Sequence, residues 1–157
     1  MKRIMFVCHG NICRSPMAEF IFKKMIAERG RADEFTVRSS ATSTEEIPFG
    51  RGNPIYPPAK AMLRERGVSF DEDKRACLLL KSDYEKYDAF ICMDSKNMRN
   101  MLRIFGSDPC GKIHRLLDFT SDGGDVADPW YTSDFEKTYA DLSVSCEKLL
   151  SMLLKNK

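Results

Sequence analysis

Short apolar runs alternate along this chain with longer stretches in which apolar residues recur every three or four positions. A continuous apolar run is typical of a strand buried on both faces, and the longer spacing is typical of an amphipathic helix. Strands are predicted at residues 3–7, 35–39, 89–93 and 113–117. Helices are predicted from residue 16 to about 29, 58 to 66, 94 or 95 to 106, and 133 to about 154, with a further short one near residue 83. This alternation predicts an α/β fold, a single doubly wound domain whose four-stranded parallel sheet carries helices on both faces.

Several residues mark the expected boundaries of these helices. Ser15 followed by Pro16 is the signature of an N-cap and a first helical turn. Capping boxes, in which glutamate stands three residues after serine, begin at Ser82 and Ser133. Glycines end three of the helices, at positions 30, 67 and 106. Residues 40–57 form a long irregular segment rich in proline and glycine, and loops of that length tend to be functional or mobile.

The segment between the first predicted strand and the first predicted helix carries the candidate chemistry. Residues 8–15 read Cys-His-Gly-Asn-Ile-Cys-Arg-Ser, and they lead from the end of a buried strand to a helix N-terminus. Backbone N–H groups and the helix dipole favour a negative charge at such a place. With a thiol at Cys8 and a guanidinium at Arg14, the loop can hold a phosphate dianion against a nucleophile.

Each residue type in this loop suits a part of that chemistry. Cysteine attacks as its thiolate, and a helix N-terminus and the nearby Arg14 both favour the thiolate form of Cys8. Arginine suits phosphate better than lysine does, because its planar fork matches two phosphoryl oxygens at once. Gly10 lets the backbone approach the anion, and Asn11 tolerates the left-handed conformation that a tight loop needs. The Ser15 hydroxyl is placed to cap the helix, to donate to the Cys8 sulfur, or to do both.

Cys13 has two interpretations that the sequence leaves open. It is either a small buried apolar residue at the junction of strand and helix, or a partner for Cys8. In the second case a reversible Cys8–Cys13 disulfide would protect the nucleophile from irreversible oxidation.

A tyrosyl or alkyl leaving group needs a proton, so the loop is expected to have an acidic partner. Asp128 is the strongest candidate, because it precedes a stiffening proline and the chain's only tryptophan, Trp130. Trp130 and Tyr131 could line a slot for a planar substrate ring, or they could anchor the last helix in the core. Asp125 and Asp94 are the alternative proton donors.

Composition narrows the class of protein further. A length of 157 residues predicts one domain spanning residues 1–157 with a substantial core. Lys and Arg number 25 against 23 Asp and Glu, which does not indicate a nucleic-acid partner. No apolar run approaches the ~20 residues of a membrane span, and the N-terminus lacks a signal-peptide cleavage pattern, so no membrane association is expected. The six cysteines are scattered and form no metal-ligand pattern, which predicts a cytoplasmic protein with reduced thiols and no metal or cofactor.

The motifs together resemble those of the low-molecular-weight protein tyrosine phosphatase family over essentially the whole chain. Val-Cys-x-Gly-Asn-Ile-Cys-Arg-Ser-Pro-Met-Ala-Glu stands at residues 7–19, and Asp-Pro followed by two aromatic residues stands at 128–131. Ser-x-x-Thr at 39–42 and Cys-Met-Asp at 92–94 also match. The resemblance implies hydrolysis of phosphotyrosine in protein substrates through a phosphocysteine intermediate, with residues 8–15 as the phosphate-binding loop.

The same resemblance implies roles for individual residues. Cys8 would be the nucleophile, Arg14 the transition-state clamp and Asp128 the general acid. Asn11, Ser15 and Ser39 would hold the loop in shape, and Trp130 and Tyr131 would wall an aromatic slot. The residues expected to contact phosphate or substrate are His9, Gly10, Asn11, Ile12, Cys13, Ser15, Trp130 and Tyr131.

Three positions depart from the family pattern. His9 follows the nucleophile where an apolar or small residue is frequent, and it is expected either at the mouth of the cleft or on the solvated surface. Residues 44–46 are Thr-Glu-Glu where many relatives have an aromatic residue, so one wall of the cleft is expected to be acidic and to disfavour very acidic phosphopeptides. Around Glu72 and Asp73 the family often has a histidine that supports Asn11, and this chain has none there.

Three other functions are compatible with parts of this pattern. A protein arginine phosphatase has threonine where this chain has Ile12, whose methyl groups favour an aromatic ring. A thiol-coupled arsenate reductase needs two further cysteines close together, and Cys77 and Cys92 are far apart in sequence. A non-catalytic phosphotyrosine-binding module would be expected to lose its nucleophile or its acid, whereas this chain keeps candidates for both.

Overall fold

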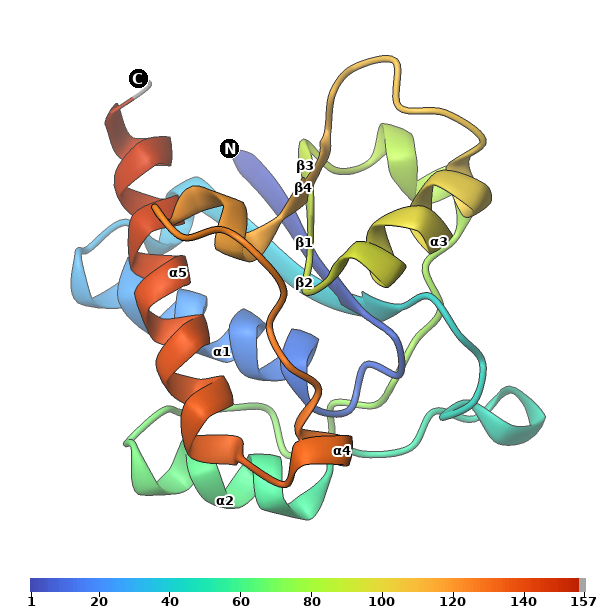
Figure 1. Ribbon diagram of the computed structural model, residues 1–157. Coiled ribbons are helices and arrows are strands. Elements are labelled where there is room, and N and C mark those ends of the chain that lie inside the picture. The colour runs from blue at the N-terminus through green and yellow to red at the C-terminus, as the bar shows by residue number, and fades with distance from the viewer. Residues whose placement is uncertain (156–157) are drawn as a thin grey trace.

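The computed structural model describes residues 1–155, and its centre is a four-stranded parallel sheet (Figure 1). The strand order is β2-β1-β3-β4. The strands are β1 (Lys2–Cys8), β2 (Phe35–Ala41), β3 (Ala89–Cys92) and β4 (Ile113–Arg115). Because all pairs are parallel, the carboxyl ends of the four strands lie at one edge of the sheet.

Helices cover both faces of the sheet, which confirms the predicted doubly wound α/β fold (Figure 1). One face carries α1 (Arg14–Glu28), α2 (Pro57–Glu65) and α5 (Phe135–Lys155), and the other carries α3 (Ser95–Phe105). The shorter helices are α4 (Pro129–Thr132) and the 3-10 helices η1 (Ala32–Glu34), η2 (Pro48–Gly50), η3 (Lys81–Glu85) and η4 (Leu116–Phe119). No helix within residues 1–155 is both long and apolar enough to cross a membrane.

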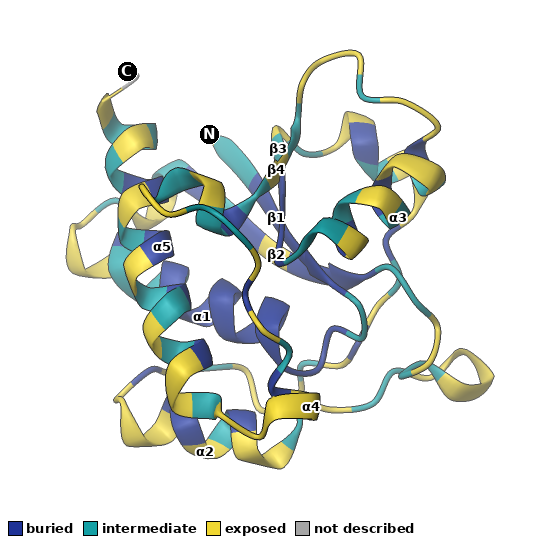
Figure 2. Ribbon diagram, in the orientation of Figure 1, coloured by how far each residue is buried: buried dark blue, intermediate teal, exposed yellow. Residues whose placement is uncertain are grey.

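The central strand β1 separates two apolar cores, because successive side chains of a strand point to opposite faces. Ile4 and Phe6 face the larger core, which they share with α1, α2 and α5. Met5 and Val7 face the smaller core, which they share with α3. Figure 2 shows β1 and the first half of α1 as the most continuously buried part of the molecule. The unbroken apolar run that predicted this strand therefore reflects burial on both faces.

The strand order changes direction beside β1. The chain leaves β1 through α1 to reach β2 on one side, and it later returns to β3 on the other side. In doubly wound sheets, ligands bind at such a switch point, beyond the carboxyl ends of the strands. Cys8 is the last residue of β1, so the topology places the candidate nucleophile at this point.

The structure corrects the predicted start of the first helix. Helix α1 begins at Arg14, its N-cap position is Cys13, and no side chain caps it. Ser15 is therefore not the N-cap. Its hydroxyl lies 3.0 Å from the Cys8 sulfur, so only the second of its two expected roles is realised.

Other boundaries are confirmed or move by a few residues. Asp94 caps α3 as expected, since its carboxylate accepts from the Asn97 N–H at 2.7 Å. The predicted capping box at Ser82 is wrong, because the Asp83 carboxylate instead accepts from the Leu80 N–H. The box at Ser133 is also wrong, because Asp134 accepts from the N–H three residues later. The strand predicted at 113–117 ends at residue 115, where the chain turns into η4.

The long irregular segment after β2 is confirmed, with η2 as its only helical turn between residues 42 and 56. The second half of this segment, which contains Gly52 and Asn53, lies against residues 75–77. The Asn53 carbonyl accepts from the Ala76 N–H at 2.9 Å. A Cβ at Gly52 would lie 1.9 Å from the Ala76 carbonyl oxygen, so this close approach requires glycine. Residues 75–77 and the long segment after β2 are therefore held together at the carboxyl edge of the sheet.

The core beneath the candidate site depends on Phe22 of α1, whose ring packs edge-on against Phe6 and Phe35 at centroid distances of 5.6 and 5.7 Å. Phe22→Ala is expected to lower the free energy of unfolding by about 3–5 kcal/mol, because it opens a cavity between helix and sheet. Urea denaturation followed by circular dichroism measures the loss. The control is Phe49→Ala, since Phe49 is fully exposed, and it should change stability by less than about 0.5 kcal/mol. Equal losses in the two variants would contradict this account of the core.

Candidate active site

Cys8 lies at the bottom of a cleft with two hydrogen-bond donors directed at its sulfur. The backbone N–H of Asn11 donates to Sγ at 3.2 Å, and the Ser15 hydroxyl lies 3.0 Å from the same atom. The residue is only 3% exposed, so bulk water stabilises its charge little. Donors that point at a sulfur favour its thiolate form, which is the form that attacks.

Asn11 sets the shape of the loop. Its φ of 60° is the left-handed conformation that the sequence predicted asparagine to tolerate. This conformation turns the N–H toward Cys8, while the side-chain Nδ2 donates to the Ser15 hydroxyl oxygen at 2.7 Å. Because Ser15 accepts from Asn11, its own proton is free to point at the sulfur. Asn11 and Ser15 therefore both contact the Cys8 sulfur, Asn11 through its backbone and Ser15 through its hydroxyl.

Arg14 is buried at the first position of α1, and its guanidinium is fully oriented by its partners. Nη1 donates to the Asp94 carboxylate at 2.7 Å and to the Val126 carbonyl at 2.9 Å. Nη2 lies 3.5 Å from the Asp128 carboxylate. Burial lowers the pKa of Arg14, but the neighbouring Cys8 sulfur and the two carboxylates outweigh it and raise the pKa above its usual value. The cation is therefore permanent.

Asp94 is a functional residue whose role the sequence did not reveal. The sequence suggested Asp94 as a possible helix start and as an alternative proton donor, but not as a partner of Arg14. Oδ1 caps α3, and Oδ2 holds Arg14. A signal existed, since Asp94 is the second residue after β3 and so stands at the same edge of the sheet as Cys8.

Asp128 reaches the same cleft from the loop before α5. It is the N-cap of α4, where its Oδ1 accepts from the Trp130 N–H at 3.0 Å. Its Oδ2 faces Arg14, and the side chain stays 26% exposed. Pro129, which is buried in the first turn of α4, restricts the backbone next to Asp128. One carboxylate oxygen is therefore held by the backbone, while the other faces Arg14 in the cleft.

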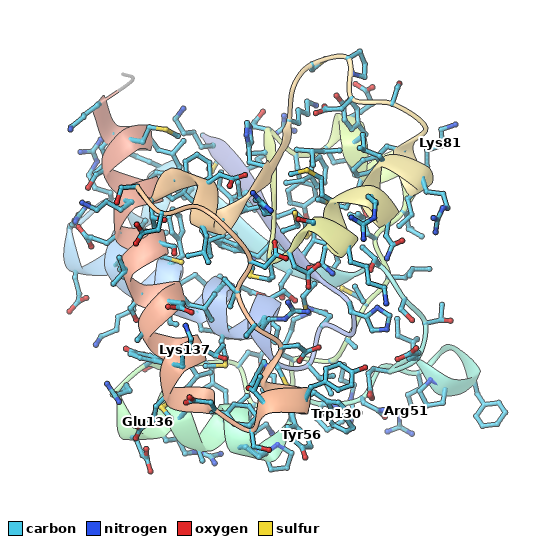
Figure 3. The ribbon with its side chains drawn as sticks, in the orientation of Figure 1. Arg51, Tyr56, Lys81, Trp130, Glu136 and Lys137 are labelled. Atoms are coloured by element: carbon cyan, nitrogen blue, oxygen red, sulfur yellow. The ribbon has the colours of Figure 1, made fainter. Side chains whose placement is uncertain are left out.

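Two exposed aromatic side chains form one wall of the cleft. Trp130 and Tyr131 both lie on α4, and the Trp130 ring is supported by Tyr56 at a centroid distance of 4.8 Å (Figure 3). Tyr56 was missed in the sequence, because it precedes a distant helix and nothing local links it to Trp130. The residues that line the cleft are Cys8, His9, Gly10, Asn11, Ile12, Cys13, Arg14, Glu45, Glu46, Asp128, Trp130 and Tyr131.

The opposite wall is acidic, as residues 44–46 suggested. Both Glu45 and Glu46 line the cleft, and His9 Nε2 lies 2.9 Å from the Glu45 carboxylate. Of the two expectations for His9, the position at the cleft mouth is therefore the correct one. The Glu46 carboxylate accepts from Asn53 at 2.7 Å, which ties this wall to the long loop.

Ser39 supports the loop less directly than the resemblance implies. Its hydroxyl donates to the buried Glu19 carboxylate at 2.6 Å, and Lys23 pairs with that same carboxylate. Its backbone carbonyl accepts from Lys74 Nζ, and Lys74 in turn donates to Asn11. The link from Ser39 to the loop therefore runs through Lys74.

The fold and this cleft define a class of protein, a doubly wound α/β domain with a cysteine and an arginine in the loop that leads from its central strand to a helix N-terminus. A family model described as low molecular weight phosphotyrosine protein phosphatase matches residues 3–157. This chain therefore belongs to that family. The matches confirm the expected enzyme class, a protein-tyrosine phosphatase.

Individual relatives agree with this family over nearly their whole length. The low molecular weight protein-tyrosine-phosphatase YfkJ of Bacillus subtilis is 36% identical over 159 residues, which cover 100% of this chain and 99% of that protein. The crystal structure of YfkJ matches with a TM-score of 0.93 and covers 100% of this chain and 97% of that one. SP-PTP, a low molecular weight protein tyrosine phosphatase from Streptococcus pyogenes, is 37% identical with a TM-score of 0.85, covering 98% and 93% of the two chains.

Cys8 and Cys13 share one loop but differ in reactivity, which brief alkylation can test. Burial, helped by the charges of Cys8 and Asp128, raises the pKa of the Cys13 thiol far above its usual value. At pH 7.5, iodoacetamide should therefore modify Cys8 and leave Cys13 as an unreacted thiol, as peptide mass spectrometry can measure. Saturating phosphate should slow labelling of Cys8 and leave labelling of the exposed Cys110 unchanged. Equal modification of Cys8 and Cys13 would contradict the assignment.

Proposed function

We propose that this protein hydrolyses phosphotyrosine in protein substrates through a phosphocysteine intermediate. One observation carries the proposal: Cys8, Arg14, Asp128 and Trp130 meet in one cleft although the chain separates them by up to 122 positions. A nucleophile, a fixed cation, an acid and an aromatic wall are the parts that this reaction requires.

The phosphate would bind in the loop of residues 8–15. The backbone amides of the loop and the N-terminus of α1 favour a dianion there. Asp94 and Val126 already occupy the two protons of Arg14 Nη1. One Nη2 proton faces Asp128. This leaves the Nε proton and the other Nη2 proton for two phosphoryl oxygens, which is the bidentate geometry that arginine provides and lysine lacks.

Two steps then follow. The Cys8 thiolate attacks phosphorus, so the S–P bond forms as the P–O bond to the tyrosyl oxygen breaks, and Asp128 gives its proton to that oxygen. In the second step the Asp128 carboxylate takes a proton from water as the water oxygen attacks phosphorus. The S–P bond breaks, which releases inorganic phosphate and restores the thiolate. Arg14 faces the equatorial oxygens in both steps.

The ring of phosphotyrosine would lie between Trp130 and Ile12. Ile12 is buried against Cys13 and Ala76 but still lines the cleft, so it offers an apolar surface at the depth of a phenyl ring. This favours tyrosyl over arginyl phosphate at that depth, because the Ile12 side chain offers an aromatic ring an apolar contact and offers a guanidinium no hydrogen-bond acceptor. The six cysteines are unpaired, and a thiolate nucleophile must stay reduced, which supports a cytoplasmic location.

The alternatives have weaker support. An arsenate reductase would need two further accessible cysteines, yet Cys92 is buried on β3, where burial raises its pKa to about 12. A panel of p-nitrophenyl phosphate, phosphoarginine and arsenate with added thiols separates these functions. Turnover of phosphoarginine or arsenate above that of the phenyl ester would overturn the proposal.

Cys8→Ser should abolish turnover of phosphotyrosine, by at least about 10³-fold, because the serine hydroxyl is a far weaker nucleophile at this site. Phosphate binding, measured by isothermal titration calorimetry, should persist, because Arg14 and the loop amides remain. Cys110→Ser is the matched control and should keep full activity, since Cys110 is exposed and outside the cleft. Substantial turnover by the Cys8 variant would refute the assignment of the nucleophile.

Asp128→Asn should lower phosphotyrosine hydrolysis more than p-nitrophenyl phosphate hydrolysis. A tyrosyl oxygen has an ordinary pKa of about 10 and needs a proton to leave, whereas p-nitrophenolate leaves readily. We expect about 10²-fold loss on phosphotyrosine and about tenfold on the nitrophenyl ester, measured as kcat. The control Asp122→Asn, in an exposed position of the preceding loop, should lose neither activity. Equal losses on the two substrates would mean that Asp128 only shapes the cleft.

A further inference from the structure

Lys74 reaches the catalytic loop from a segment that supplies no residue to the cleft. Its Nζ donates to the Asn11 side-chain oxygen at 2.9 Å, to the Arg75 carbonyl at 3.0 Å and to the Ser39 carbonyl at 3.3 Å. An ammonium group has three protons, and these three oxygens lie closer to it than the Cys77 sulfur, which is 3.8 Å away. All three are neutral oxygens, so none of them neutralises the positive charge of the Lys74 ammonium group. This charge lies against Asn11 of the loop of residues 8–15.

The orientation of the Asn11 amide follows from these contacts. Its Oδ1 accepts from Lys74 Nζ and also from the Cys77 N–H at 3.1 Å, so the oxygen must face this side. Its Nδ2 must then face Ser15, where it donates at 2.7 Å. Because the Ser15 hydroxyl oxygen accepts this hydrogen bond, the Ser15 hydroxyl directs its own proton to the Cys8 sulfur, which lies 3.0 Å away.

A continuous chain of hydrogen bonds thus runs from Lys74 through Asn11 and Ser15 to Cys8. Each donor in the chain is polarised by the one before it, and a charged donor at the start strengthens those that follow. The same contacts hold Asn11 at its positive φ, which is what directs its backbone N–H at the sulfur. This series of hydrogen bonds ends at the Cys8 sulfur, which must carry a negative charge in order to attack.

We propose that Lys74 is a positioning residue of this enzyme, which orients Asn11 and stabilises the Cys8 thiolate without touching the substrate. The proposal rests on the proposed function, because it concerns the same nucleophile. It assigns to an ammonium group the support of Asn11 for which the family resemblance suggested a histidine near residues 72–73.

Alkylation of Cys8 as a function of pH tests the proposal directly, because it reads the thiolate and requires no turnover. In Lys74→Met, which keeps the apolar stem, the midpoint of the Cys8 alkylation rate should move upward by about half a pH unit or more. The kcat for phosphotyrosine should fall about tenfold, because a buried amide oxygen loses its charged donor. Labelling is quantified on the Cys8 peptide, since Cys77 lies beside Lys74 and is itself exposed.

Lys60→Met is the matched control. Lys60 carries the same side chain on α2, and it pairs with Glu72 outside the cleft at 3.4 Å. This variant should keep the wild-type midpoint and a kcat within about twofold. A Lys74→Met protein that matches the Lys60 variant in both readouts would overturn the proposal.

Two further variants separate positioning from a general loss of structure. Lys74→Arg retains charge and donors, so it should keep the wild-type midpoint even if Lys74→Met does not fold, and a displaced midpoint in a folded Arg variant would overturn the proposal. In an Asn11→Ala background, replacing Lys74 with methionine should cause no further loss, because its acceptor is gone. Full additivity of the two losses would show that Lys74 acts elsewhere. Wild-type turnover and the Cys8→Ser variant test the proposed function separately.

Discussion

Burial of the Arg14 guanidinium is the constraint around which the active site is built. With only 3% of its side chain exposed, Arg14 requires partners for its charge and its protons, since an unpaired buried cation is very costly. Those partners are the carboxylate of Asp94, after β3, and the carbonyl of Val126, in the loop before α4. The same arginine reaches Asp128. One buried cation thus joins the start of α1, the segment after β3 and the loop that carries Asp128.

The cleft divides its charges between two levels. Deep in the loop, the Cys8 sulfur and Arg14 are held by buried donors and acceptors, where electrostatic interactions are strong and little screened. At the mouth, the acidic wall of Glu45 and Glu46 lies in contact with solvent, where charges act mainly on approach and selection of a partner. The buried and the solvent-exposed charged groups therefore lie at different depths of the same cleft.

The predictable part of the site consists of residues whose neighbours in sequence are also their neighbours in space. Cys8, Asn11 and Arg14 lie within one turn between a strand and a helix, so the type of each residue and its spacing indicated its task. Asp128 was identified for a similar reason, because Pro129 and the adjacent aromatics mark a rigid loop. By contrast, the hydroxyl of Ser15 was assigned to two roles, and only its distance of 3.0 Å to the sulfur selected one.

The sequence by itself determined the alternating strands and helices, the doubly wound architecture and the candidate catalytic loop. These follow from local periodicity and from the chemistry of consecutive residues, which do not depend on distant contacts. Only the tertiary structure decided that Asp94 holds Arg14, that Tyr56 supports Trp130 and that Lys74 supports Asn11. Each of these pairs is separated by more than 60 positions, and a contact between distant segments depends on how the sheet and its loops are packed. An aspartate, a tyrosine and a lysine are also common surface residues, so their types carried no signal until the fold brought them to the edge of the sheet where Cys8 lies.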